Sequence, residues 1–190
     1  MKTLKMNSVR VLLNLFLMAT LFSACSQTNK KSNEQPVVEK SAMDIHAAVM
    51  ANNLEVVRQH IEAGSNLNVK DNFSGSTPLN TAAVFGKTKI AKELIDAGAD
   101  LSVKNNDGST PLHTAAFFGR VEIVQMLIDA HADKTLRNNF GATPRETVAG
   151  PFSDMKPIYE MMQQQLAPLG LKLDMEQLQK NRPVIAMMLQ

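Results

Sequence analysis

The middle of this sequence contains one segment written twice. Gly75-Ser-Thr-Pro-Leu-Asn-Thr-Ala-Ala-Val-Phe-Gly86 returns 33 residues later as Gly108-Ser-Thr-Pro-Leu-His-Thr-Ala-Ala-Phe-Phe-Gly119. Each copy runs on into apolar residues at helical spacing, and a third Thr-Pro pair, Thr143-Pro144, keeps the same period. Self-similarity at this period is typical of solenoids, in which each unit buries its apolar face against its neighbours. We therefore expect an all-α repeat solenoid.

The repeated unit resembles the ankyrin repeat, whose period and Thr-Pro-Leu-His-x-Ala motif match Thr110 to Ala115. The resemblance extends from about residue 42 to residue 150 and implies helix-turn-helix units joined by hairpin loops. It also implies a binding scaffold rather than an enzyme. We expect an ankyrin repeat domain over 41–150, with about three full repeats and a partial fourth, divided as 41–70, 71–104, 105–137 and 138–150.

Local signals support helices within the repeats. The Thr77 hydroxyl can cap the first helix of its repeat, and Pro78 fits the first helical position because it lacks an N–H. Ile90, Leu94 and, one repeat later, Leu127 are expected in the core. His131 replaces the glycine that ends the preceding repeat, so we expect it in the left-handed region of backbone space.

The two ends of the array depart from the pattern. The first repeat lacks the Thr-Pro pair before His46, and Gly150-Pro151 interrupts the fourth. Residues 151–190 do not form another repeat. Helical spacing predicts a helix from Pro157 to Leu166 and another from Asp174 through Leu178, which Pro183 kinks or restarts. We interpret 151–190 as a helical cap; the alternative is a methionine-rich groove for a partner.

The N-terminal residues 1–24 have the basic start and short apolar run of a secretory signal peptide. Ser23-Ala24-Cys25 resembles the end of a bacterial lipobox, which implies that Cys25 becomes lipidated; the alternative is an ordinary thiol beside a simple cleavage site. Residues 25–40 are polar and predict a flexible tether. Ser26 after the cysteine favours the outer membrane, with the protein facing the periplasm.

Composition argues against several functions. Removal of residues 1–24 leaves 17 basic and 18 acidic residues, and no basic patch with aromatics suggests a nucleic-acid partner. The single cysteine excludes a disulfide within the chain. No motif indicates a metal, a cofactor, a phosphate loop or a catalytic nucleophile. By the resemblance, His46 and His113 hydrogen-bond loop backbone of a neighbouring repeat. We therefore expect no catalytic residues, no cofactor and no small-molecule substrate.

Ankyrin repeats bind proteins through their hairpin tips and the ends of their first helices, which line a concave face. The resemblance places ten residues there: Phe73, Ser74, Ser76, Val84, Phe85, Asn106, Asp107, Ser109, Phe117 and Phe118. For Phe85 and Phe118 the alternative is packing between repeats. We expect Phe73 and Phe117 to face a partner together, because rigid aromatic anchors dominate interface energetics.

The leading functional hypothesis is a monomeric, non-catalytic protein–protein interaction module, tethered to the bacterial cell envelope by Cys25 and binding an unidentified protein. The alternative is a structural or protective envelope lipoprotein, of the immunity type, that shields or neutralises an enzyme. An enzyme is the third possibility.

Overall fold

The computed structural model describes residues 43–190, and within that range it contains helices and loops but no strand. The all-helical repeat fold predicted from the period is confirmed. The signal peptide predicted at 1–24, Cys25 and the tether predicted at 25–40 lie outside the described residues. None of the helices within 43–190 is long and apolar enough to cross a membrane.

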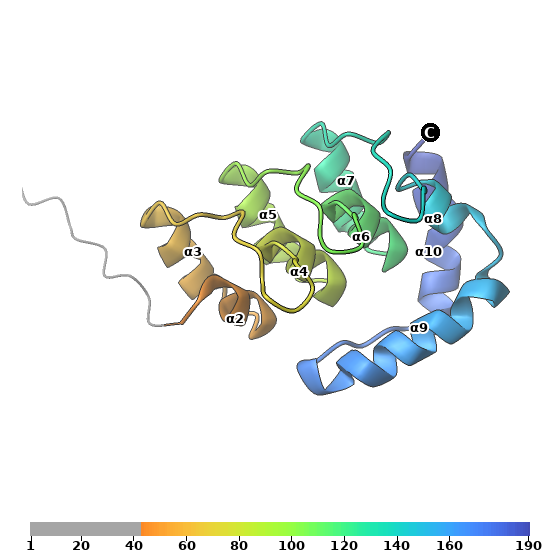
Figure 1. The fold of residues 1–190 in the computed structure, drawn as a ribbon, viewed down its shortest axis with the longest axis horizontal. Helices are drawn as coiled ribbons and strands as arrows, with labels where there is room; N and C mark the ends of the chain where they lie inside the picture. The colour runs from red at the N-terminus through yellow and green to blue at the C-terminus, as the bar shows by residue number, and fades with distance from the viewer. Residues whose placement is uncertain (1–42) are drawn as a thin grey trace, which may run out of the picture. The chain divides into compact units, whose positions relative to one another are not determined.

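Three helix pairs form the stack (Figure 1). The first helices of the pairs, α2, α4 and α6, pack side by side, and so do the second helices, α3, α5 and α7. Their bounds are α2 Ile45–Met50, α3 Leu54–Glu62, α4 Pro78–Phe85, α5 Thr88–Asp96, α6 Pro111–Phe117 and α7 Val121–Asp129. Each unit thus contacts the next through both of its helices.

The predicted caps begin the first helices of the second and third repeats. The Thr77 hydroxyl accepts a hydrogen bond from the Asn80 N–H at 3.2 Å, and Pro78 is the first residue of α4. Thr110 and Pro111 do the same for α6. The second helices α5 and α7 have no side-chain cap at their N-termini. They are amphipathic, so packing of their apolar faces stabilises them.

The core runs along the middle of the stack. Ile90, Leu94 and Leu127 are fully buried, as predicted. Pairs of fully buried alanines, Ala82 with Ala83 and Ala115 with Ala116, lie on α4 and α6. Alanine leaves room for neighbouring helices to approach closely, which explains why the Thr-Ala-Ala segment recurs in both repeats.

The C-terminal segment contains α8 Glu146–Ala149, α9 Phe152–Leu166, the 3-10 helix η1 Ala167–Leu169 and α10 Met175–Met188. Helix α10 packs against α7 and α8. Ile185 on this helix and Leu189, just after it, belong to the core. The last repeat therefore buries its apolar side against α10 rather than against another repeat.

Both helix predictions around prolines need correction. Helix α9 begins at Phe152 rather than at Pro157, and α10 runs through Pro183 without interruption to Met188. Each proline removes one helical hydrogen bond, to the carbonyl four residues earlier. Those carbonyls belong to Ser153 and Gln179, which are exposed like the prolines themselves, so water can bind them.

One position in each repeat ties it to the next loop. The His46 Nε2 lies 3.1 Å from the Val69 carbonyl oxygen, the Asn80 amide donates to the Val103 carbonyl at 3.4 Å, and the His113 Nε2 lies 3.0 Å from the Ala142 carbonyl oxygen. This is the role expected for His46 and His113. His131 ends its repeat with φ at 61°, in the left-handed region as predicted.

Candidate protein-binding surface

Three loops precede the first helices of the second, third and fourth units, and we name them the tip loops: residues 71–76, 105–109 and 138–142. Each loop is closed by one backbone hydrogen bond, donated by its first residue to its last. These bonds join Asp71 to Ser76 at 2.9 Å, Asn105 to Ser109 at 3.0 Å, and Asn138 to Ala142 at 3.0 Å. The same closed turn therefore occurs at three places in the stack.

An acidic or amide side chain organises each tip loop from its first position. The Asp71 carboxylate accepts from the backbone N–H groups of Phe73 at 2.8 Å and Ser74 at 2.6 Å. Asn105 and Asn138 accept equivalent bonds within their own loops. Aspartate and asparagine favour turns because their side chains can bond the backbone in this way.

The Asp71 carboxylate is held in its charged form. Burial raises the pKa of Asp71, but hydrogen bonds from Ser74, Phe73 and Ser76 outweigh burial and lower the pKa below its ordinary value. The Ser76 N–H donates at 3.0 Å and the Ser74 hydroxyl at 3.0 Å to the second carboxylate oxygen. The first tip loop is thus fixed from inside by one anion, even though it is one residue longer than the other two.

The tip loops are also bonded to each other. The Asn106 N–H donates to the Ser74 carbonyl at 2.9 Å, and the Asn139 N–H donates to the Asp107 carbonyl at 2.9 Å. The Asn139 side-chain amide adds a bond to the Asn106 carbonyl at 2.9 Å. The three loops therefore form a continuous ladder along one edge of the stack.

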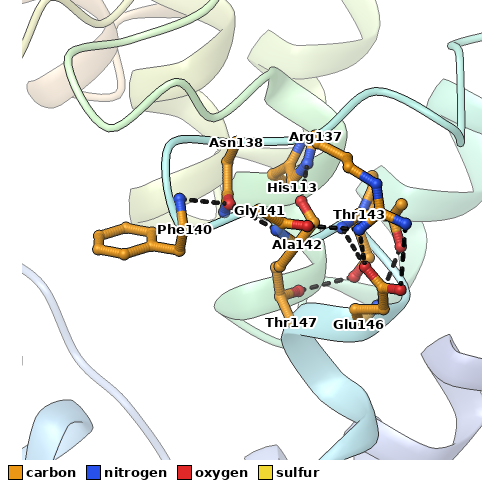
Figure 2. Close-up of polar contacts among 10 residues, drawn as sticks. His113, Arg137, Asn138, Phe140, Gly141, Ala142, Thr143, Glu146 and Thr147 are labelled. Carbon is orange, nitrogen blue, oxygen red and sulfur yellow. Dashed lines mark hydrogen bonds and ion pairs between the residues drawn. The ribbon is translucent and has the colours of Figure 1, made fainter.

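The third tip loop has additional support from the fourth unit (Figure 2). The Arg137 guanidinium forms an ion pair with Glu146 at 2.8 Å and also binds the Gly141 carbonyl. Glu146 accepts from the Thr143 N–H at 2.8 Å. Figure 2 shows the Phe140 ring pointing away from this polar cluster. The backbone of the loop is thus braced while its aromatic ring stands free.

Two phenylalanines stand on this ladder almost fully exposed. Phe73 on the first tip loop is 89% exposed and Phe140 on the third is 78% exposed. Exposed Asn106 and Asp107 lie on the loop between them. We name these four residues the tip row. Phe140 is absent from the residues predicted for binding, although the sequence carries a signal for it, since Asn-Phe follows both Asp71 and Asn138.

Two of the ten residues predicted for binding are not on the surface. Ser76 is 5% exposed, because its N–H and hydroxyl bond Asp71 and Ser74 inside the first tip loop. Phe118 is 5% exposed, so it follows the packing alternative. The interface prediction must therefore be corrected at these two positions. For the other eight residues it remains a prediction.

Phe117 does not stand free either. Its ring lies 4.7 Å from the ring of Tyr159 on α9 and 5.1 Å from that of Phe118, between ring centres. The Tyr159 hydroxyl donates to the Phe117 carbonyl at 2.8 Å. Half-buried Phe117 is thus part of the contact between α6 and α9. Val84 and Phe85, at the same end of α4, are half-buried, and the Val84 carbonyl accepts from Arg120 at 2.8 Å.

The histidines offer no catalytic constellation among the described residues. His60 is 5% exposed and its ring nitrogens lie 3.1 Å from the Ser65 hydroxyl and 2.8 Å from the Met43 carbonyl. His46 and His113 bind loop carbonyls, as described above. Within residues 43–190 no group of three or more histidine, cysteine, aspartate or glutamate side chains could hold a metal ion.

Comparison with known proteins agrees with this architecture. A family model described as ankyrin repeats matches residues 45–138 in three copies. The ankyrin repeat domain of Bcl-3, a member of the IkappaB protein family, has a crystal structure that superposes with a TM-score of 0.53 at 29% identity, covering 54% of this chain and 45% of that one. Residues 45–138 are therefore ankyrin repeats.

Curated relatives match about a third of this chain. Human protein phosphatase 1 regulatory subunit 27 is 39% identical over 64 residues, which are 34% of this chain and 41% of that protein. Protein phosphatase 1 regulatory subunit 12A of mouse is 38% identical over 77 residues, 39% of this chain and 8% of that protein. The match thus spans less than half the length of these relatives.

Proposed function

We propose that this protein is a non-catalytic protein-binding module that recognises its partner through the tip row, with Phe73 and Phe140 as apolar anchors. The near-complete exposure of these two rings carries the proposal. Contact with a partner would remove the apolar surface of each ring from water. Burial of such a side chain contributes about 1.5–3 kcal/mol.

The rigidity of the tip loops supports this function. The three loops are cross-bonded by Asn106 and Asn139 and closed internally by Asp71, Asn105 and Asn138. A partner therefore meets anchors that are already positioned, and binding costs little ordering of the backbone. The exposed Asp107 between the anchors favours a partner surface with a basic or N–H-rich group flanked by apolar pockets.

The names of the relatives agree with a binding role. The two protein phosphatase 1 proteins are called regulatory subunits, which are components that accompany another protein. The similarity covers about a third of this chain, 34% and 39% for the two subunits. We infer binding of a protein from this, without inferring the same partner.

Site-specific photo-crosslinking in cells tests the proposal. A photoreactive phenylalanine replaces Phe73 in one protein, Phe140 in a second and Leu169 in a third. Leu169 is the matched control, because it is also exposed, at 47%, but lies in η1, outside the tip loops. We expect one and the same adduct from positions 73 and 140 and none from position 169. An adduct from position 169 alone would place the interface on the C-terminal helices.

Substitution then measures the contribution of the anchors. Phe73→Ser combined with Phe140→Ser should weaken binding of the captured partner by about 2 kcal/mol or more, as truncation of an interface anchor does. The melting temperature should stay nearly unchanged, since both rings lie outside the core. Leu169→Ser should change neither property. Normal binding by the double variant would remove the tip row from the interface.

We also propose that Cys25 carries the lipid that tethers the module to a bacterial envelope, at the outer membrane and facing the periplasm. The cysteine directly follows small residues at the end of the apolar run, and it is the only one in the chain. Acyl chains contribute about 0.8 kcal/mol per buried CH₂, so several chains hold a protein firmly.

Metabolic labelling with a fatty-acid analogue tests the tether. Wild-type protein should incorporate the label and sediment with membranes, whereas Cys25→Ala should do neither. The circular dichroism and melting temperature of the variant should match those of wild type, because Cys25 lies outside the repeats. A wild-type protein that takes up no label would end the lipoprotein proposal and leave the binding proposal untouched.

A further inference from the structure

A pocket of about 350 Å³ lies between α8 and α10, at the C-terminal end of the stack. Its walls include two arginines, Arg145 and Arg182, and no aspartate or glutamate. Pockets of roughly 300–1,000 Å³ are the usual size of sites for small molecules. The pocket is on a different part of the molecule from the tip row.

Arg182 is a buried cation without a carboxylate partner. Arg182 is 3% exposed, and none of the ion pairs among residues 43–190 includes it. Its guanidinium donates to the Tyr159 hydroxyl at 2.7 Å and to the carbonyls of Thr147 at 3.4 Å and Gly150 at 3.1 Å. All of these acceptors are neutral. A buried charge is costly unless an opposite charge or hydrogen bonds compensate it.

The guanidinium of Arg182 has unused donors. A guanidinium carries five N–H groups. Bonds from Nη1 and Nη2 account for three of them, while Nε and one N–H of Nη2 have no acceptor within the described part of the chain. Arg145 uses its Nε for the Ala186 carbonyl at 3.2 Å and likewise forms no ion pair there. The pocket therefore offers N–H donors of two cations.

The remainder of the wall is mainly apolar. Val148 is buried at 3% exposure, Phe152 is half-buried, and Met187, at 62% exposure, lies at the pocket rim. Gln190 also lines the pocket, but its main-chain oxygen accepts a hydrogen bond from the Lys134 ammonium at 2.6 Å. A guest of this pocket thus meets both positive charge and apolar surface.

We propose that this pocket binds a carboxylate carried on a short apolar chain, either a free organic acid or the C-terminal residue of a peptide. The carboxylate accepts hydrogen bonds from Arg182 and Arg145, and the apolar chain lies between Val148, Phe152 and Met187. A planar carboxylate suits guanidinium donors, with which it forms charge-assisted bonds. A phosphate dianion would leave more of its oxygen atoms without a donor against the apolar wall.

NMR titration of the full chain, labelled with ¹³C at methionine methyl groups and ¹⁵N at arginine side chains, tests this site. The probes are hexanoate, 1-hexanol and inorganic phosphate, together with an acetylated Ala-Leu dipeptide with a free or an amidated C-terminus. We expect saturable shifts of the Met187 methyl and of the arginine N–H signals with hexanoate. Binding of hexanol, phosphate and the amidated peptide should be weaker by about tenfold or more, the effect of losing one charged contact.

The peptide arm distinguishes the two sources of the carboxylate. Tighter binding of the free-carboxylate peptide than of hexanoate identifies a C-terminal residue as the guest, and the reverse identifies a free acid. Equal binding of hexanoate and hexanol, or of hexanoate and phosphate, would overturn the proposal, as would the absence of saturable shifts with every probe.

Variants tie the signal to the pocket. Arg145→Gln should weaken hexanoate binding by about tenfold, since it removes one cation while keeping a polar side chain. Because Arg145 is exposed, the fold should persist, whereas a change at Arg182 would remove three hydrogen bonds of a buried side chain. Ala186→Leu should fill the pocket and abolish binding. Arg58→Gln is the matched control, because Arg58 is an exposed arginine on α3, outside the pocket wall. Unchanged affinity of Arg145→Gln for hexanoate would overturn the assignment. The tip-row variants should bind hexanoate as wild type does.

Discussion

His113 links the stability of the repeats to pH. His113 is 1% exposed, and this burial lowers the pKa of its imidazole. The hydrogen bond to the Ala142 carbonyl raises that pKa but does not outweigh burial. The histidine of an unfolded chain titrates near about 6.5. As the pH falls below that value, His113 binds a proton in the unfolded chain but remains neutral in the folded protein. The free energy of unfolding therefore decreases below about pH 6.5 until the pH passes the folded pKa.

His113→Asn should remove this part of the pH dependence. Asn80 shows that asparagine can occupy the equivalent position and bond the next loop. Urea denaturation of wild type should show stability falling between pH 7 and pH 5 by at most about 1.4 kcal/mol per pH unit on account of this one group. The variant should follow a flatter curve, though it starts from a lower stability at pH 8. Parallel curves for the two proteins would mean that His113 titrates normally in the fold.

The burial of two adjacent phenylalanines at the end of α6 was only partly predictable. The sequence predicts packing between repeats as an alternative for Phe118, whereas it predicts that Phe117 faces a partner. Their orientation depends on Tyr159, which lies 42 residues further along the chain and binds the Phe117 carbonyl. Phe73 differs, because a loop tip with an extra residue has no core beside it. Its exposure was therefore predictable.

At the scale of elements, the glycines of the first two tip loops, Gly75 and Gly108, lie closest to the neighbouring unit. Gly108 has φ at 71°, and a Cβ there would overlap the Asn139 side chain and lie 2.8 Å from its backbone nitrogen. Gly64 has nearly the same conformation, with φ at 64°, but nothing lies within 4 Å of its would-be Cβ. An alanine at either position would be held in the same left-handed backbone conformation. The two positions differ only in the space available to its Cβ.

Gly108→Ala should therefore destabilise the protein more than Gly64→Ala. The alanine at 64 should cost about 1 kcal/mol for a side chain in the left-handed region. The alanine at 108 should cost more, because the ladder between the second and third tip loops must also open. Chemical denaturation measures both differences, and hydrogen exchange at Asn139 should rise only in Gly108→Ala. Equal costs would indicate that the loops can separate without loss.

Helix boundaries were predictable where a cap marks them and not where tertiary contacts decide. Thr77 and Thr110 are local signals, and the helices they begin were placed correctly. Pro157 was interpreted as the start of a helix and Pro183 as a kink or a restart, because local rules disfavour proline inside helices. Both helices nevertheless continue through them, since Tyr159 on α9 and Ile185 on α10 are buried against the rest of the protein.

For the whole molecule, stability depends on interfaces between units rather than on any unit alone. Leu94 on α5 is fully buried and lies in the middle of the stack. Leu94→Ala should lower the free energy of unfolding by about 2–5 kcal/mol, as large-to-small core changes do. Lys92→Ala, on the exposed side of the same helix, should change it by less than about 1 kcal/mol, since it loses only a surface ion pair with Asp96.

Far-UV circular dichroism and fluorescence from a label on α10 should report the same unfolding midpoint in the Leu94→Ala variant. In so short an array, loss of a central unit leaves the flanking units without a partner for their apolar faces. Two separate midpoints would show that the C-terminal helices hold the last repeat together independently.

The bonds between tip loops join residues about one period apart, as Asn139 and Asn106 do at a separation of 33 residues. A duplication of residues 105–137 would consequently supply both halves of each new junction at once, and the array could lengthen without inventing an interface. Such an insertion would move Phe140 one step further from Phe73 while leaving both rings exposed. The number of units sets the spacing between Phe73 and Phe140. Duplication of a unit would therefore change which partner fits both aromatics, without substituting either of them.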